Sequence, residues 1–244
     1  MKGVILAGGL GTRLRPLTFI TNKHLLPVYD KPMIYYPIRT LVEAGITEIM
    51  IVTGGPHCGH FIRVLKNGDE WGITHLEYAY QEEEGGIADA IALAESFADE
   101  ESITVILGDN TTDADIKPAV ESFDGGARVF LKHVPDPKRF GVPVFDATDH
   151  TKVAKIIEKP KKPANDYAVV GLYIFDHTVF DRIRKLNPSD RGELEVTDLN
   201  NSYIADGQLK WSELKGFWSD AGTFESLFRS NEFWAKKARQ KAVS

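Results

Sequence analysis

The stretch "KGVILAGGLGTRLRP", residues 2–16, joins a short apolar run to three glycines and two arginines. The run from Val4 to Leu6 has the length and the β-branched content of a buried strand. Glycines after a strand leave backbone N–H groups free to surround an anion, and guanidinium groups donate in pairs to phosphate oxygens. The stretch therefore predicts a strand followed by a loop that binds a polyphosphate. The alternative is a tight turn that carries surface arginines.

Two familiar phosphate loops do not fit this stretch. A P-loop needs a glycine, four residues and then Gly-Lys-Ser/Thr, but the residue directly after Gly11 is Thr12 and not lysine. The dinucleotide fingerprint needs a third glycine at position 14, which is Leu14, although Asp30 lies at a suitable distance to be its acidic residue. A nicotinamide-dependent oxidoreductase therefore remains only as a weaker alternative.

Composition and charge limit the class of protein. The chain has 244 residues, is 43% hydrophobic and carries a formal net charge of -6. It is long enough to bury one large core, so we expect a single domain over residues 1–244. An acidic chain disfavours a nucleic-acid polymer or an anionic membrane as partner, and no apolar segment has membrane-spanning length. The single cysteine, Cys58, excludes an intramolecular disulfide. These features predict a cytoplasmic protein.

Apolar runs of strand length alternate with helix-like segments along the first half of the chain. In residues 38–45, for example, Ile38, Leu41 and Val42 recur at helical spacing and Gly45 provides a stop. Between Lys132 and Pro163 the chain becomes rich in proline and charge, which predicts an inserted, β-rich region that covers a substrate. We expect an α/β, Rossmann-like, mixed and mostly parallel sheet flanked by helices, with a smaller inserted β-rich region and a C-terminal helix over about 222–240.

Two aspartates follow apolar or aromatic segments and stand beside glycine. Asp109 ends the run "SITVILGDN", at the carboxyl end of a predicted strand, where open α/β sheets bind ligands. Asp220 lies in "GFWSDAGTF". Two carboxylates that converge on a triphosphate suit Mg²⁺, whereas the simpler interpretation of Asp109 is a turn residue that caps a helix. The segment "GGPHCGH" contains His57, Cys58 and His60, but their spacing fits no standard zinc site.

The pattern from Gly8 to Pro16, followed by Lys23 to Val28, resembles the sugar nucleotidyltransferases. The segment "YDKPMIYYP" narrows the resemblance to the glucose-1-phosphate thymidylyltransferases, and further motifs extend it from Lys2 to about Phe233. The resemblance implies a nucleotide-diphospho-sugar transferase fold, with a nucleotide-binding part at about 1–130 and a sugar-binding, metal-completing part at about 131–225. It implies dTTP and glucose-1-phosphate as substrates and Mg²⁺ as cofactor.

For the nucleotide, the resemblance combines with the chemistry of single residues. Gln81 offers a hydrogen-bond donor and an acceptor, which complements the edge of thymine or uracil; the alternative is a surface loop rich in Glu82, Glu83 and Glu84. Charge neutralisation of the phosphates is expected from Arg13, Lys23 and Lys159. The residues expected to bind the nucleotide are Leu6, Gly8, Gly9, Gly11, Thr12, Arg13, Lys23, Gln81, Gly86 and Asp109.

The sugar and metal sites are assigned by the resemblance alone. On charge and proline content, the segment "IIEKPKKP" would be a solvated hairpin; the resemblance makes its Glu158 and Lys159 contacts to the sugar hydroxyls and phosphate. The residues expected to bind the sugar are Asn110, Gly141, Glu158, Lys159, Gly171, Glu193 and Trp218. Asp109 and Asp220 are the expected metal ligands.

The chain departs from the family pattern in three ways. His24 stands where many members carry glutamine, Phe140 stands where many carry tyrosine, and the C-terminal extension of the longer members is missing. A transferase that uses UTP or both nucleotides remains an alternative, because Gln81 would pair equally well with uracil. A catalytically silent sugar-nucleotide sensor is a further alternative, although the charged groups that catalysis needs are all present. We expect a homo-oligomer.

Overall fold

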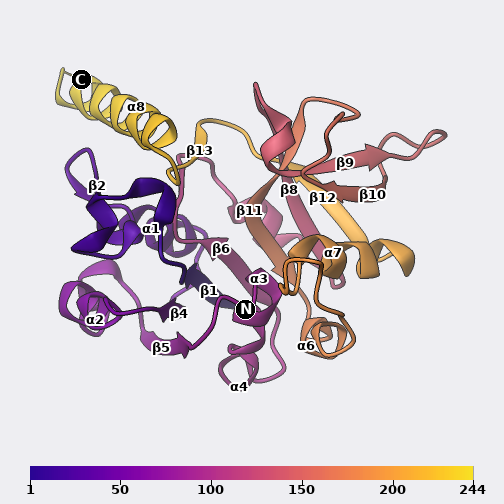
Figure 1. Cartoon of the computed structure of the whole chain (residues 1–244), viewed down its shortest axis with the longest axis horizontal. Helices are drawn as coiled ribbons and strands as arrows, with labels where there is room; N and C mark the ends of the chain where they lie inside the picture. Colours follow the sequence, from indigo (N-terminus) through magenta and orange to yellow (C-terminus); the bar gives the residue numbers. More distant parts are fainter. Residues whose placement is uncertain (244) are drawn as a thin grey trace.

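The computed structural model describes the backbone of residues 1–243 and the side chains of residues 1–240. A nine-stranded mixed sheet runs through the molecule in the order β10-β9-β11-β6-β1-β4-β5, with β8 paired to β11 and β12 paired to β8 (Figure 1). Its strands are β1 (Lys2–Ala7), β4 (Glu48–Gly54), β5 (His75–Gln81), β6 (Ile103–Leu107), β8 (Ala127–His133), β9 (Gly141–Phe145), β10 (Val153–Glu158), β11 (Tyr167–Phe175) and β12 (Leu209–Glu213). The helices are α1 (Tyr35–Glu43), α2 (Gly59–Leu65), α3 (Ile87–Ala92), α4 (Glu95–Ala98), α5 (Lys117–Glu121), α6 (Val179–Ile183), α7 (Val196–Ala205) and α8 (Phe224–Val243).

Strand β1 lies in the middle of the parallel part of the sheet. It pairs in parallel with β4 on one side and β6 on the other. Its side chains alternate between two cores, because successive residues of a strand point to opposite faces: Val4 and Leu6 pack in one cluster, and Ile5 and Ala7 pack in the other. Burial on both faces explains why the opening run is continuously apolar.

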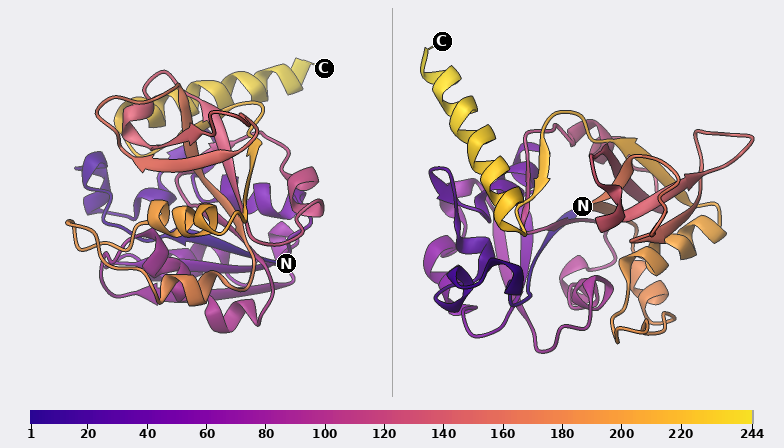
Figure 2. Two further views of the ribbon diagram at one scale, coloured as in Figure 1. Left: turned by 90° about the vertical axis from the view of Figure 1, so that its right-hand side faces the viewer. Right: turned by 45° about the horizontal axis from the view of Figure 1, so that its top comes forward.

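The C-terminal half of the sheet is mixed. Strand β11 is antiparallel to β6, β8 and β9, and β10 is antiparallel to β9. The β-rich insertion predicted between Lys132 and Pro163 is therefore a hairpin that extends the main sheet. In the right-hand view of Figure 2, this half of the sheet and the indigo N-terminal segments lie on opposite sides of the molecule.

The helix predicted in residues 38–45 is confirmed as α1, and Gly45 follows it with a φ of +85°. Helix α8 returns to the N-terminal part of the chain, where Leu227 and Trp234 share a core cluster with Leu14 and Met33. Two small sheets complete the fold: β2 (Pro27–Val28) pairs with β3 (Lys31–Pro32), and β7 (Asn110–Thr112) pairs with β13 (Trp218–Asp220). None of the helices in the described part of the chain is both long enough and apolar enough to cross a membrane.

Candidate active site

The glycine-rich loop leaves β1 and turns into a short 3₁₀ helix at Thr12–Leu14. Gly9 and Gly11 adopt φ values of +86° and +61°, which residues with a side chain rarely adopt. Among the residues that the structure describes, the N–H groups of these two glycines make no hydrogen bond to another backbone group. The N–H of Leu10, between them, donates to the Glu84 carboxylate over 2.9 Å. The loop thus presents backbone N–H groups to an anion, and one of them, that of Leu10, already binds the Glu84 carboxylate.

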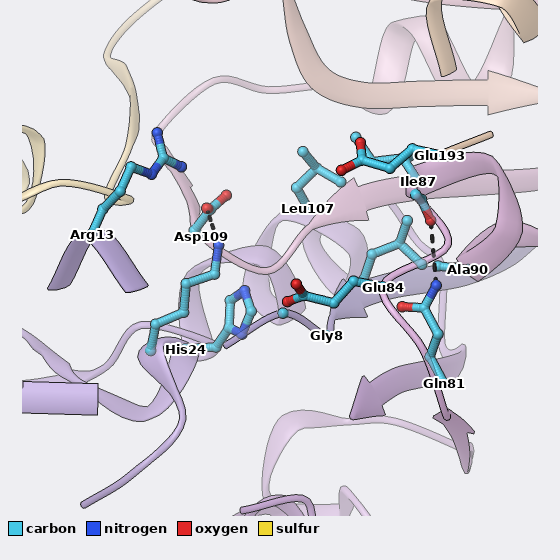
Figure 3. A pocket seen from close by; sticks show the side chains of 14 residues that line it. Gly8, Arg13, His24, Gln81, Glu84, Ile87, Ala90, Leu107, Asp109 and Glu193 are labelled. Atoms are coloured by element: carbon cyan, nitrogen blue, oxygen red, sulfur yellow. Dashed lines mark hydrogen bonds and ion pairs between the residues drawn. The ribbon is translucent and has the colours of Figure 1, made fainter. Parts of the chain in front are cut away.

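A cavity of about 340 Å³ opens beside this loop (Figure 3). The strands β1 and β6 supply its floor, and the loop after β5 and the start of α3 supply its far wall. Its lining consists of Leu6, Gly8, Gly9, Arg13, Lys23, His24, Gln81, Glu84, Gly86, Ile87, Ala90, Leu107, Asp109 and Glu193. Polar and charged groups thus line both ends of one cavity.

Lys23 and Asp109 form an ion pair at one end of the cavity. Lys23 Nζ lies 2.7 Å from Asp109 Oδ2, and Asn110 Nδ2 lies 3.1 Å from Asp109 Oδ1. Burial by itself would raise the pKa of Asp109, but the Lys23 charge and these two hydrogen bonds hold that pKa well below its usual range. Asp109 is therefore a carboxylate at neutral pH.

His24 is buried next to this ion pair. Its backbone N–H donates to Asn22 Oδ1 over 2.9 Å, and its Nδ1 lies 2.7 Å from the same oxygen. Burial, together with the adjacent Lys23 charge, lowers the pKa of His24 to about 3, so the ring is neutral. Since an amide oxygen only accepts, Nδ1 carries the proton. A Cβ added at Gly108 would lie 2.8 Å from His24 Cδ2, so the ring packs directly on the turn that precedes Asp109.

The pairing of β7 with β13 brings Asp220 close to Asp109, because it places Asp220 opposite Asn110, the next residue in the chain. The N–H of Ala221 donates to the Asp109 carbonyl oxygen over 2.8 Å. Burial and then the Asp109 charge raise the pKa of Asp220, and Arg139 Nη2 lies 2.9 Å from Asp220 Oδ2. An added Cβ at Gly222 would lie 3.2 Å from Arg13 Nη2 and 3.4 Å from Asp109 Oδ2. The absence of a side chain at Gly222 therefore leaves room for both groups beside this residue.

The donor set fits a hard divalent cation that binds with phosphate. Among the side chains described, no three His, Cys, Asp or Glu residues cluster as a metal site, and this includes the segment of His57, Cys58 and His60. Mg²⁺ does not need such a cluster, because it binds through one or two carboxylates plus phosphate oxygens and water. Asp109 and Asp220 meet that requirement, since they lie close enough for the Asp109 charge to contribute to the raised pKa of Asp220.

A second group of polar residues lies on the C-terminal half of the sheet. Thr197, in the first turn of α7, donates to Glu158 Oε2 over 2.6 Å, and Lys159 Nζ lies 3.1 Å from Glu158 Oε1. A Cβ added at Gly141 would lie 3.6 Å from Glu158 Oε2, so this strand passes close to the carboxylate. One hydrogen bond and one ion pair thus hold the Glu158 carboxylate.

Asn110 connects Trp218 to the cavity residue Asp109. Trp218 Nε1 donates to Asn110 Oδ1 over 2.6 Å, while Asn110 Nδ2 donates to Asp109. A Cβ added at Gly171 would lie 2.8 Å from Asn110 Nδ2 and 2.5 Å from Leu107 Cδ1, so only glycine fits there. Phe140 packs edge-on against Trp218 with ring centroids 5.5 Å apart.

The structure gathers most of the predicted nucleotide residues around the cavity. Gly11 and Thr12 lie in the loop but outside the lining, and Asn110, from the predicted sugar set, adjoins the cavity through its hydrogen bond to Asp109. Glu193, expected with the sugar set, lines this cavity together with the residues expected to bind the nucleotide, and a Cβ added at Gly86 would lie 3.1 Å from Glu193 Cβ.

Gln81 differs from the expectation that it offers both a donor and an acceptor. Its Nε2 donates to Asp89 Oδ2 over 2.7 Å and to the Gly86 carbonyl over 3.3 Å. Both N–H bonds of the amide are thus used inside the protein, because an amide nitrogen has only two. The carbonyl oxygen alone is left for a ligand.

Sequence analysis did not assign Glu84, Asp89 or Arg139 to the site. Glu84 lies in an acidic run that is equally typical of a solvated loop. Asp89 sits at a first-turn helix position, where carboxylates are common for electrostatic reasons. Arg139 follows prolines and lies 81 residues from Asp220, so no local pattern connects the two.

Comparisons with known proteins identify the family of this chain. Residues 2–237 match the family described as Nucleotidyl transferase, and the chain belongs to that family. Among its relatives is the glucose-1-phosphate thymidylyltransferase of an Actinoplanes species, 42% identical over 96% of this chain and 78% of its own length. The enzyme of the same name from Neisseria meningitidis is 43% identical over 96% of this chain and 82% of its own length.

Solved structures show the same fold. A Bacillus anthracis protein, assigned as a glucose-1-phosphate thymidylyltransferase and solved in complex with a sucrose, has a TM-score of 0.90 and 48% identity, covering 96% of this chain and 94% of its own. A UDP-glucose pyrophosphorylase complexed with UDP-glucose has a TM-score of 0.83 at 22% identity, covering 97% and 98%, and supports the fold alone.

Proposed function

We propose that this chain transfers the thymidylyl group of dTTP to glucose-1-phosphate, which forms dTDP-glucose and pyrophosphate. The observation that carries the proposal is one cavity that has Arg13 and Asp109 on one side of Gly8 and Gln81 on the other, with Lys23 paired to Asp109. This arrangement suits a nucleoside triphosphate, with the cationic groups and loop N–H groups for the phosphates and the Gln81 amide for the base. The names of the relatives favour the thymidylyl group and glucose-1-phosphate.

The reaction needs no covalent intermediate on the protein. An oxygen of the sugar phosphate attacks the α-phosphorus of dTTP, and the bond from that phosphorus to the oxygen bridging to the β-phosphorus breaks as pyrophosphate leaves. The nucleophile is already an anion, so catalysis depends on positioning and charge neutralisation more than on a general base. In this proposal Arg13 and Lys23 stabilise the α-phosphate and the leaving pyrophosphate, and Lys159 holds the attacking phosphate.

The remaining assignments are proposals of the same kind. Asp109 and Asp220 would hold Mg²⁺, which supplies positive charge to the phosphate oxygens when it is bound. Asn110, Glu158 and Trp218 would contact the hexose. The proposed substrates of this chain are small water-soluble molecules, which favours a cytoplasmic place of action. That the chain forms a homo-oligomer stays a prediction.

Release of pyrophosphate tests the proposal directly. The protein is offered glucose-1-phosphate and Mg²⁺ with dTTP, UTP, CTP, ATP or GTP in separate assays. We expect the highest kcat/KM with dTTP. A preference for UTP would keep the mechanism and change the nucleotide. Absence of release with every nucleotide, from protein that is folded, would contradict the proposal and favour a sugar-nucleotide sensor.

A further inference from the structure

The Gln81 side-chain amide has a fixed orientation. Its two partners, the Asp89 carboxylate at 2.7 Å and the Gly86 carbonyl at 3.3 Å, can only accept hydrogen bonds. An amide turned by 180° would place its own oxygen against both of these oxygens. The nitrogen therefore faces Asp89, and the oxygen faces the opposite way.

The amide oxygen faces the cavity. A Cβ added at Gly8, which lines the cavity, would lie 3.0 Å from Gln81 Oε1. Figure 3 shows the oxygen of Gln81 on the side of Gly8, with the nitrogen turned toward the start of α3. A ligand in the cavity thus meets an acceptor at this position.

Asp89 is itself held by its surroundings. It lies in the first turn of α3, and Gly85 leaves room for its carboxylate, since a Cβ there would lie 2.6 Å from Asp89 Cγ. The backbone of this segment is tied to Leu194, in the loop before α7. The Leu194 N–H donates to the Gly85 carbonyl over 2.8 Å, and the Leu194 carbonyl accepts from the Ala88 N–H over 3.2 Å. The position of the carboxylate therefore depends on tertiary structure and not only on the α3 helix.

We propose that Asp89 is a positioning residue that sets the base selectivity of the site. By holding the Gln81 nitrogen away from the cavity, it leaves a carbonyl acceptor that selects a pyrimidine with a proton on N3. Thymine and uracil carry that proton, whereas N3 of cytosine is an acceptor and would face the Gln81 oxygen without a hydrogen between them. This inference rests on the proposed function for its assignment of Gln81 to the base.

The test compares dUTP with dCTP, which share the sugar and lack a 5-methyl group, so only the pairing edge differs. For the unaltered protein we expect kcat/KM, measured with glucose-1-phosphate, to favour dUTP by at least about tenfold, the size of one mismatched buried hydrogen bond. Asp89→Ala frees the Gln81 amide to rotate, and the preference should fall by about fivefold or more. Calorimetric affinities of dUDP and dCDP should change in the same direction without any turnover.

Asp89→Asn is the matched control. It removes the same charge from the first turn of α3 but keeps an oxygen that can accept from Gln81, so most of the preference for dUTP should remain. An equal loss of preference in both variants would assign Asp89 a general electrostatic role and overturn the inference. So would an unchanged preference in Asp89→Ala, or no preference in the unaltered protein. If the diphosphates bind with the expected selectivity but no nucleotide is turned over, the proposed function fails and the inference stands.

Discussion

The two ends of the candidate site are built in different ways. At the nucleotide end, the glycine loop and Asp109 follow β1 and β6, two adjacent parallel strands, so the strand ends themselves bring the groups together. At the sugar end, side chains hold one another: Thr197 positions Glu158, and Trp218 positions Asn110. Backbone topology therefore positions the first set, and a hydrogen-bond network positions the second.

This difference predicts different kinetic consequences. Substitutions at the nucleotide end should act on the neutralisation of phosphate charge and lower kcat. Substitutions at the sugar end should act on the orientation of one substrate and raise its KM. The experiments below test this contrast, starting with the largest expected effect.

Asp109→Asn should lower kcat at least about 100-fold, because it removes a carboxylate from the proposed metal site and leaves the Lys23 ammonium without its partner. Steady-state pyrophosphate release measures the change. Asp113→Asn is the matched control, since Asp113 pairs with Lys237 over 2.6 Å but does not line the cavity. Equal losses of activity in the two variants would show that the Asp109 effect is one of folding.

His24 should make the protein sensitive to acid. Its pKa is about 3 in the folded state against an ordinary value of 6.5, so between these values the unfolded chain binds a proton that the folded chain does not. The free energy of unfolding should thus be unaffected above pH 6.5 and fall as the pH is lowered below it. Between pH 6.5 and pH 5 the loss amounts to about 2 kcal/mol at roughly 1.4 kcal/mol per pH unit.

Urea denaturation of the unaltered protein and of His24→Gln measures this loss. Glutamine does not titrate, so the difference between the two proteins isolates the histidine from the carboxylates that also respond to acid. Parallel curves from pH 7 to pH 5 would contradict the assignment of a neutral, buried imidazole.

Trp218→Phe should raise the KM for glucose-1-phosphate about fivefold to tenfold while the KM for dTTP stays unchanged. The variant keeps an aromatic ring against Phe140 but loses the hydrogen bond to Asn110 Oδ1, which is worth about 1 kcal/mol. Initial rates with each substrate varied in turn separate the two constants. A change in the KM for dTTP instead would remove the contrast between the two ends.

Glu84→Gln should tighten dTTP binding by about threefold, since the carboxylate occupies the Leu10 N–H in an exposed contact and repels the triphosphate. Isothermal calorimetry measures the affinity. Glu83→Gln removes the same charge from the neighbouring position and should have a smaller effect. Weaker binding in Glu84→Gln would show that Glu84 contacts the nucleotide instead of competing with it.

Local sequence was sufficient for the features that depend on periodicity and backbone freedom. The run from Val4 to Leu6 predicted β1 because a strand that is buried on both faces needs apolar side chains at every position. The spacing of Ile38 and Leu41 predicted α1 for a similar reason, since one face of the helix is buried. The glycines of the loop were identifiable because positive φ values are costly for other residues.

Contacts between distant segments were beyond such patterns. The Arg139–Asp220 ion pair forms across 81 residues, and the Glu193 side chain lies beside Gly86 because the loop before α7 packs against the start of α3. The orientation of the Gln81 amide was also beyond such patterns, although its two partners lie only five and eight residues away in the chain. The sequence alone indicates that an amide is present, but only the packed positions of Asp89 and Gly86 decide which of its atoms faces the ligand.

The sequence by itself thus determined the mixed α/β sheet, the glycine-rich loop after β1 and the family, because these depend on residue types at fixed local spacing. Tertiary structure decided the protonation and orientation of the groups in the site. Burial makes His24 neutral, Lys23 keeps Asp109 ionised, and Asp89 turns Gln81 toward the cavity. Those properties arise from desolvation and from neighbours in space, which no order of residues along the chain specifies directly.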